Sequence, residues 1–233
     1  PIPQERREKS DKSFFKTGFN DVSEGWKIIR SRPEVSRIIT AKALWSCFGG
    51  GLVYMLIMLG AEGEFGEVAA GIGILFAARG IGTGIGPILA RYVFTEKNLW
   101  PYLLGILVSA CGLGYLMIGL FEWGIWITIV IVISHAASGA NWVLSTVLLQ
   151  ERSEDAWRGR MFATDFLLMT TVNGFSTMAA SLILEYTEIG LRSTLIVFSI
   201  LQIVSGIVWL LLTSPGEKKF SSLKISDSGG AIA

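Results

Sequence analysis

Three ionisable side chains stand inside long apolar stretches of this sequence: Arg79, His135 and Asp165. An Arg or Asp at the centre of a membrane-spanning helix costs about 2.5–3.5 kcal/mol on insertion scales, so it is rarely left facing lipid. Such groups face the protein interior or a watery route, where they can pair with a charge, bind a polar ligand or carry protons. Amides at Asn141 and Asn173 add hydrogen-bonding groups inside the same stretches.

Each of these residues also has a purely structural interpretation. Arg79 could satisfy backbone carbonyls or a neighbouring helix, and His135 could be a hydrogen-bonded helix contact instead of a proton carrier. Asn141 and Asn173 are as able to join two helices as to contact a substrate. We predict that these four residues line a polar pathway.

Asp165 lies about one turn inside its apolar stretch, close to a group of basic residues. Three arginines are near enough in the predicted topology to pair with it: Arg91, Arg158 and Arg160. A structural ion pair that forms in one conformation and parts in another would act as a latch. We therefore predict a gate made of Asp165 and these arginines.

The sequence lacks the residue motifs that are typical of catalytic sites and of cofactor-binding sites. There is one histidine, no His-Glu-x-x-His metal motif and no phosphate-binding loop. His135 and Ser138 share one apolar stretch, so they cannot form a hydrolase pair on facing helices. Cys47 and Cys111 also lie in apolar stretches, without metal-ligand spacing. The sequence predicts a protein that is not an enzyme and uses no cofactor.

The apolar stretches are long enough to cross a membrane. Hydrophobic residues make up 51 % of the 233 residues and charged ones 17 %, against about a quarter charged in a soluble domain. A spanning helix needs about 20 mostly apolar residues. Six segments meet this requirement: 43–61, 68–90, 98–121, 123–150, 161–184 and 193–216. They predict an all-α polytopic membrane protein with six transmembrane helices, and the net charge of +1 indicates no nucleic-acid partner.

The distribution of Lys and Arg predicts the orientation of these helices. Eighteen of the twenty basic residues lie in stretches that alternate stacking puts on one side of the membrane. Those stretches are residues 1–42, 91–97, 151–160 and the segment after 216. Only Arg192 falls on the other side. The positive-inside rule therefore predicts a multi-pass protein of the cell membrane with both termini in the cytoplasm.

The chain divides into three parts by composition. Residues 1–34 are expected to be a cytoplasmic linker with a juxtamembrane helix near residues 21–30. Residues 35–213 form the transmembrane bundle, and residues 214–233 are Ser-, Gly- and Lys-rich and predicted to be a disordered cytoplasmic tail. Within the bundle, the third helix of each consecutive triple lacks ionisable groups and the second contains one. This pattern predicts a 3+3 inverted repeat whose third helices face lipid.

Glycines are concentrated in the second apolar stretch. Gly80 with Gly84, and Gly82 with Gly86, are each spaced as GxxxG. Small residues at this spacing let two helix backbones approach closely in a bilayer. Helix packing is therefore their expected role, and Pro87 beside them could let the helix bend.

Three segments resemble motifs of the major facilitator superfamily. Residues 71–86 (GIGILFAARGIGTGIG) are similar to the eighth helix of its enterobactin-exporter-like branch. Residues 25–35 (GWKIIRSRPEV) resemble the start of helix seven. Residues 141–150 (NWVLSTVLLQ), followed by 157–163 (WRGRMFA), resemble helices ten and eleven with the Arg-Gly-Arg loop that joins them. The similarity covers about residues 20–213.

The resemblance implies the C-terminal six-helix half of a secondary transporter that exports small or hydrophobic molecules by alternating access. It implies that Arg158 and Arg160 brace the cytoplasmic gate and that Arg79 faces the cavity. Arg91 begins the loop after helix eight, where the family's longer charged motif is reduced to Arg91 and Lys97.

The family uses twelve helices in two halves, so an N-terminal half is the expected partner, in the same chain, as a split gene product or as a second copy. The lipid bilayer, a small-molecule substrate and protons are the other expected partners. The alternative is a six-helix membrane scaffold or assembly partner that transports nothing and uses its glycine faces to bind other helices.

Overall fold

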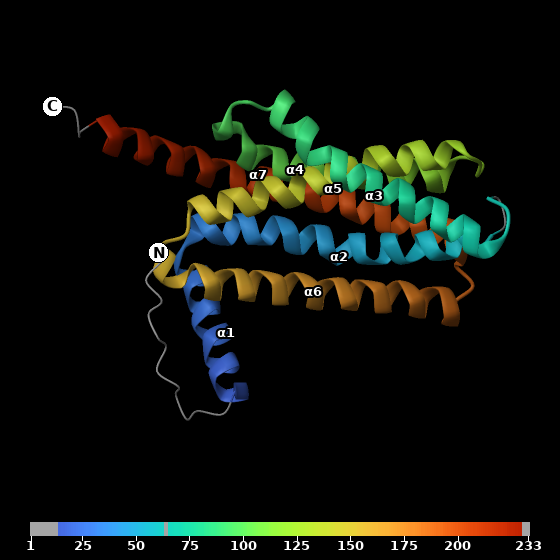
Figure 1. Ribbon diagram of the computed structural model, residues 1–233, viewed down its shortest axis with the longest axis horizontal. Coiled ribbons are helices and arrows are strands. Elements are labelled where there is room, and N and C mark those ends of the chain that lie inside the picture. Colours follow the sequence, from blue (N-terminus) through green and yellow to red (C-terminus); the bar gives the residue numbers. More distant parts are fainter. Residues whose placement is uncertain (1–13, 63–64, 230–233) are drawn as a thin grey trace, which may run out of the picture.

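The computed structural model describes residues 14–62 and 65–229, and helices account for most of them (Figure 1). The elements are α1 (Phe14–Ser31), α2 (Pro33–Ala61), α3 (Val68–Val93), a short 3₁₀ turn η1 (Lys97–Leu99), α4 (Trp100–Leu120), α5 (Trp126–Glu151), α6 (Asp155–Tyr186) and α7 (Gly190–Gly229). Helices α2 to α7, with η1 extending α4, are long and apolar enough to cross a membrane. The six predicted spans and the all-α fold are therefore confirmed.

The six spans pack as two related triples, α2–α4 and α5–α7. The main contacts join α3 to α5, α2 to α6 and α4 to α7, followed by α4 to α5 and α2 to α7. If α2, α3 and α4 of the first triple correspond to α5, α6 and α7 of the second, the α3–α5 contact corresponds to the α6–α2 contact. The α4–α5 contact corresponds in the same way to the α7–α2 contact. These contacts agree with the predicted inverted repeat, whereas the α2–α3 contact has no counterpart of similar extent between α5 and α6. The repeat therefore stays a prediction.

Close backbone approach explains part of this packing. Gly82 and Gly86 of α3 lie against the carbonyls of Val132 and Ala136 in α5, closer than any Cβ would allow. By contrast, Gly84 has open space where a Cβ would be, and so does Gly80. One GxxxG pair therefore packs inside this bundle and the other faces outward.

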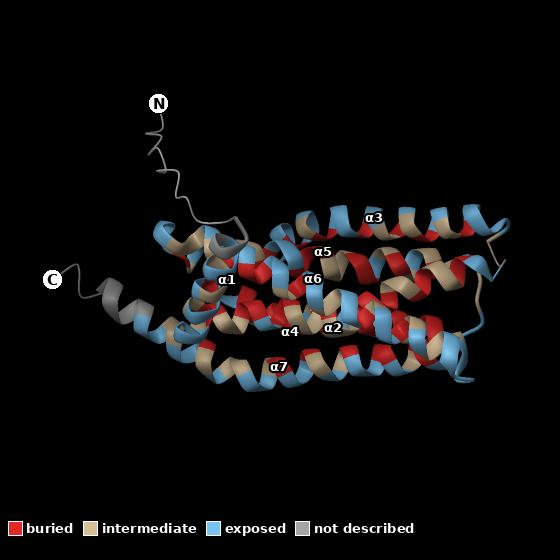
Figure 2. Cartoon of the chain, turned by 90° about the horizontal axis from the view of Figure 1, so that it is seen from below, coloured by how far each residue is buried: buried red, intermediate tan, exposed pale blue. Residues whose placement is uncertain are grey.

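The outward faces of the helices differ in chemistry. On α4 the exposed residues are aliphatic or alanine and methionine, and on α7 those between residues 197 and 212 are aliphatic throughout. Helices α3 and α6 are the least buried of the six, and Figure 2 shows the exposed outer side of α3. Their exposed residues include Gly80, Thr83 and Gly84 on α3 and Thr170 and Thr171 on α6.

Helix α1 lies across the direction of the spans, at the end of the bundle where α6 begins (Figure 1). It starts at Phe14, earlier than the sequence predicts, and it packs on α6, where Gly25 lies against Thr164. The Ile29 side chain of α1 is buried. Residues 1–13 of the predicted linker lie outside the described residues.

The predicted disordered tail is wrong for residues 214–229, because α7 continues as a helix through Pro215 to Gly229. The reason is that the start of this segment is bound to the bundle. The Glu217 side chain turns inward to two arginines, and the guanidinium of Arg152 lies 4.8 Å from the ring centre of Phe220. Residues 230–233 lie outside the described part of the chain.

Substitution at Gly86 tests the close approach of α3 and α5. We expect Gly86→Ala to destabilise the protein by about 1–3 kcal/mol, because the new Cβ would overlap the Ala136 carbonyl and a packed core resists expansion. Thermal unfolding of the purified protein in detergent measures the effect. Gly84→Ala is the matched control, with the same chemical change and no atom within 4 Å of the new Cβ. Equal melting temperatures for the two variants would contradict this packing.

Candidate functional site

A buried ion pair joins α2 to α6. Lys42 Nζ lies 2.9 Å from Asp165 Oδ2, and the two side chains are only 5 % and 6 % exposed. The ammonium also donates a hydrogen bond to Thr146 Oγ1 of α5 at 3.1 Å and lies 5.5 Å from the ring centre of Trp142. The other carboxylate oxygen, Asp165 Oδ1, is buried and has no hydrogen-bond partner among the described residues. Three helices therefore meet at one charged group.

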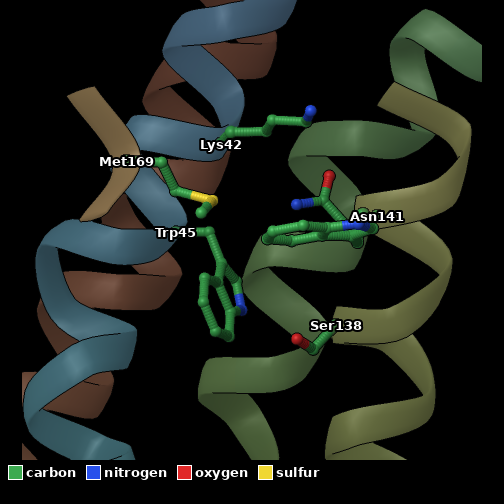
Figure 3. A pocket seen from close by; sticks show the side chains of 6 residues that line it. Lys42, Trp45, Ser138, Asn141 and Met169 are labelled. Carbon is green, nitrogen blue, oxygen red and sulfur yellow. The ribbon is translucent and has the colours of Figure 1, made fainter. Parts of the chain in front are cut away.

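A small cavity adjoins this ion pair between α2, α5 and α6 (Figure 3). It is lined by Lys42, Trp45, Ser138, Asn141, Trp142 and Met169. The space open to a water-sized molecule is about 10 Å³, about enough for one water. Asn141 Oδ1 and Trp45 Nε1 are buried here without hydrogen-bond partners in the described part of the chain. The cavity thus offers unpaired donors and acceptors beside a buried charge.

Arg79 is a charge without an acidic partner among the described residues. It lies on α3, partly buried, with its guanidinium carbon 5.8 Å from the ring centre of Phe76. Its Nε is buried and has no hydrogen-bond partner in the described chain. Since a guanidinium stays charged in proteins, this helix holds an uncompensated positive charge at span depth.

Comparison with known protein families identifies the family of this chain. Residues 2–176 match the sequence profile described as the Major Facilitator Superfamily. The chain belongs to the major facilitator superfamily. It is therefore a multi-pass membrane protein of a transporter family, not an enzyme. No curated protein and no solved structure matches it.

The four predicted pathway residues of this superfamily member lie in different settings. Asn141 lines the cavity, and Arg79 is partly open. Asn173 packs against Gly50 of α2, where a Cβ would lie 2.9 Å from its amide nitrogen. His135 is 1 % exposed, and its Nε2 is 2.8 Å from the hydroxyl of Tyr115 in α4. His135 thus makes an interhelical contact, which matches the structural interpretation that the sequence left open for it.

The predicted pairing of Asp165 with Arg91, Arg158 or Arg160 is wrong, because its partner is Lys42. The sequence predicts a first span over residues 43–61, so Lys42 would lie just outside it. However, α2 starts at Pro33, so Lys42 lies more than two turns inside the helix and reaches Asp165.

The three arginines have other surroundings. Arg160 pairs with Asp21 and Glu24 of α1, at 3.3 Å and 3.1 Å. Arg158 pairs with Asp155 at 2.6 Å and donates a hydrogen bond to the Ser153 carbonyl. Arg91 is exposed. Because α1 folds back onto α6, its carboxylates lie nearer to Arg160 than Asp165 does.

A second ion cluster closes the end of the bundle where α2 and α6 begin, which we call the basic end. Glu217 of α7 is 2 % exposed and lies 2.6 Å from Arg37 Nε of α2 and 2.7 Å from Arg152 Nη2 at the end of α5. Arg152 also donates to the backbone carbonyl of Glu34 at 2.7 Å. Sequence reasoning missed this cluster because it assigned Glu217 to the tail; the charges that flank the apolar stretches were the available signal.

Neutralising Glu217 tests the cluster. We expect Glu217→Gln to destabilise the protein by about 3–5 kcal/mol, because it leaves two buried guanidinium groups without their carboxylate. Thermal unfolding in detergent measures the effect. Glu151→Gln removes the same charge from the more exposed pair with Lys97 and should cost at most about 1 kcal/mol. Equal losses from the two substitutions would show that Glu217 is not buried in this way.

Proposed function

We propose that this chain is the C-terminal six-helix half of a secondary transporter that exports small or hydrophobic molecules by alternating access. Membership of the major facilitator superfamily supports transport, and the resemblance of residues 71–86 to the enterobactin-exporter-like branch supports export. The observation that carries the proposal is the chemical difference between the outward faces of the helices.

The exposed sides of α4 and α7 match the hydrocarbon of a bilayer, because they consist of side chains such as Leu113, Val204 and Leu211. The exposed sides of α3 and α6 also carry large apolar side chains such as Ile85 and Phe166. Among these they present glycine and threonine, as at Gly84 and Thr171. Such residues favour close contact with other helices or with polar solutes over contact with lipid. In our proposal, α3 and α6 therefore border the transport pathway, and α4 and α7 face lipid.

Arg79 supports a polar route along this face. A charge at membrane depth needs a partner, because its desolvation is otherwise too costly. No such partner lies among the described residues, so we propose that the partner comes from the substrate or from a second half of the transporter. Asn141 and Asn173 extend the route through the bundle. His135, bound to Tyr115, would hold α5 and α4 together behind it.

We further propose that an N-terminal six-helix half covers the open face of α3 and α6, either in the same chain, as a split gene product or as a second copy. The outward glycines Gly80 and Gly84, with open space where a Cβ would be, suit the close approach of another helix. Lipid surrounds the remaining faces in this arrangement.

The basic end would face the cytoplasm, with both termini on that side, because most of the Lys and Arg residues lie there. We propose that Arg91, Arg158 and Arg160 belong to the cytoplasmic gate. Arg91 is exposed and free to meet a partner half, whereas Arg160 ties α6 to α1. Asp165 lies deeper than these arginines, which supports a role between gate and pathway.

Efflux by the complete transporter tests the assignment. We expect Arg79→Ala to abolish export of substrate while membrane insertion stays intact, because the pathway loses the charge that attracts its ligand. Accumulation of a panel of fluorescent substrates in cells, with and without a protonophore, measures export, and detergent-extracted protein on a gel measures insertion.

Lys97→Gln is the control, since Lys97 pairs with Glu151 on the exposed surface. Normal efflux by the inserted Arg79→Ala variant would contradict the pathway role of Arg79. Absence of efflux of every substrate by the unmodified transporter would favour a scaffold without transport.

A further inference from the structure

We propose that one side of α1 binds the surface of an anionic lipid bilayer. This side consists of Phe19, Trp26, Lys27 and Arg30, and we call it the interfacial side of α1. Its aromatic rings would enter the membrane interface, and its cations would contact phosphate-bearing headgroups. The proposal does not depend on transport; only the assignment of this bilayer surface to the cytoplasmic leaflet rests on the orientation proposed above.

The four residues lie on neighbouring positions of one helix side. Because an α-helix has about 3.6 residues per turn, positions four or seven residues apart share a side, as Phe19, Trp26 and Arg30 do. Phe19 is 76 % exposed and Trp26 is 39 % exposed, and Lys27 and Arg30 are exposed as well. Large aromatic side chains beside Lys and Arg are typical of a helix that lies in the interface of a membrane.

The packing of α1 on α6 orients the interfacial side toward the membrane. Gly25 faces α6 at Thr164. Asp21 and Glu24 reach Arg160, which lies one turn nearer the start of α6 than Thr164 does. The flank of α1 with the carboxylates therefore points toward the basic end. The interfacial side, on the opposite flank, points back along the spans, and Figure 1 shows α1 crossing the spans and extending beyond α6.

The charges of α1 are sorted between these two flanks. Both carboxylates of the helix bind Arg160, at 3.3 Å and 3.1 Å, so they are compensated within the protein. Lys27 and Arg30 form no ion pair among the described residues. The guanidinium carbon of Arg30 lies 5.5 Å from the ring centre of Trp26. The interfacial side thus presents two positive charges without a carboxylate beside them.

An anionic bilayer matches this side in both chemistry and shape. Trp is enriched at membrane–water interfaces, because its ring is apolar and its N–H remains hydrated there. Lys and Arg keep their charged ends among headgroups while their methylene groups contact apolar surface. The side is the outer surface of a single helix, which suits an extended partner. The cytoplasmic leaflet carries anionic lipids, so its charge is complementary to that of Lys27 and Arg30.

Binding of α1 to lipid would also act on α6. Helix α1 is fixed to the first turns of α6 by the Gly25–Thr164 contact and by the ion pairs of Arg160. An anionic surface that holds α1 therefore holds the start of α6 at the level of the headgroups. In this way the lipid composition of the membrane would influence the position of a span.

Hydrogen–deuterium exchange of α1 tests the proposal. The full chain is reconstituted in vesicles of phosphatidylcholine, or of phosphatidylcholine with phosphatidylglycerol, at one salt concentration. We expect the amides of residues 19–30 to exchange about 30-fold more slowly when phosphatidylglycerol is present. The reason is that each Lys or Arg near an anionic surface contributes a factor of about five, which corresponds to about 1 kcal/mol.

A pair of double variants tests the role of the cations. Lys27→Gln with Arg30→Gln should remove the difference between the two kinds of vesicle, because the headgroups lose their partners. Lys218→Gln with Lys219→Gln is the matched control, since it neutralises two exposed basic residues of α7 at the same end of the bundle. The control should keep the difference at α1.

A second pair of variants tests the apolar contact. Phe19→Ala should speed the exchange of α1 in both kinds of vesicle, because ring insertion does not depend on headgroup charge. Asn20→Ala changes the neighbouring exposed residue, which lies beside the interfacial side, and should leave the exchange unchanged.

Two outcomes would overturn the proposal. Equal exchange of α1 in the two kinds of vesicle would show that anionic headgroups are not its partner. Equally slow exchange in detergent and in both vesicles would show that protein contacts alone hold the helix, as with a second transporter half. Neither measurement requires a transported substrate, so lipid binding by α1 and the proposed function can fail independently.

Discussion

The cost of a charge in a low-dielectric interior is the constraint on which this structure depends. Inside a bilayer neither water nor mobile ions compensate a charged side chain, so the fold must supply a partner. Lys42 finds Asp165 across two helices, and Glu217 finds two arginines at the basic end. These pairs connect α2 to α6, and α7 to α2 and to the end of α5, by charged contacts. Arg79 has no such partner among the described residues.

Close packing of helix backbones is the second requirement, because lipid tails compete with apolar side chains for the same contacts. Glycines solve this problem between α3 and α5 at Gly82 and Gly86, and Gly105 and Gly206 meet across α4 and α7. A polar cavity lies where α2, α5 and α6 converge beside Lys42.

Much of the architecture follows directly from the sequence. Long uncharged stretches fix the number of spans, because only a helix satisfies its backbone polar groups within hydrocarbon. The placement of ionisable residues also predicts a repeat, since a span that faces lipid is not expected to carry them. Arg79, Asn141 and Asp165 are recognisable as unusual without any structure, because position along a span is a local property.

Partners, however, are not a local property, and only the tertiary structure decided them. Nothing in the sequence around Lys42 distinguishes it from the other basic residues that flank the spans; it is buried because α2 begins at Pro33 and packs on α6. Glu217 likewise became a buried ligand of two arginines through the continuation of α7. The sequence by itself determined which residues need a partner in the membrane, because that need depends on depth and charge. The three-dimensional packing determined which partner each one has, because that depends on the register of helices far apart in the chain.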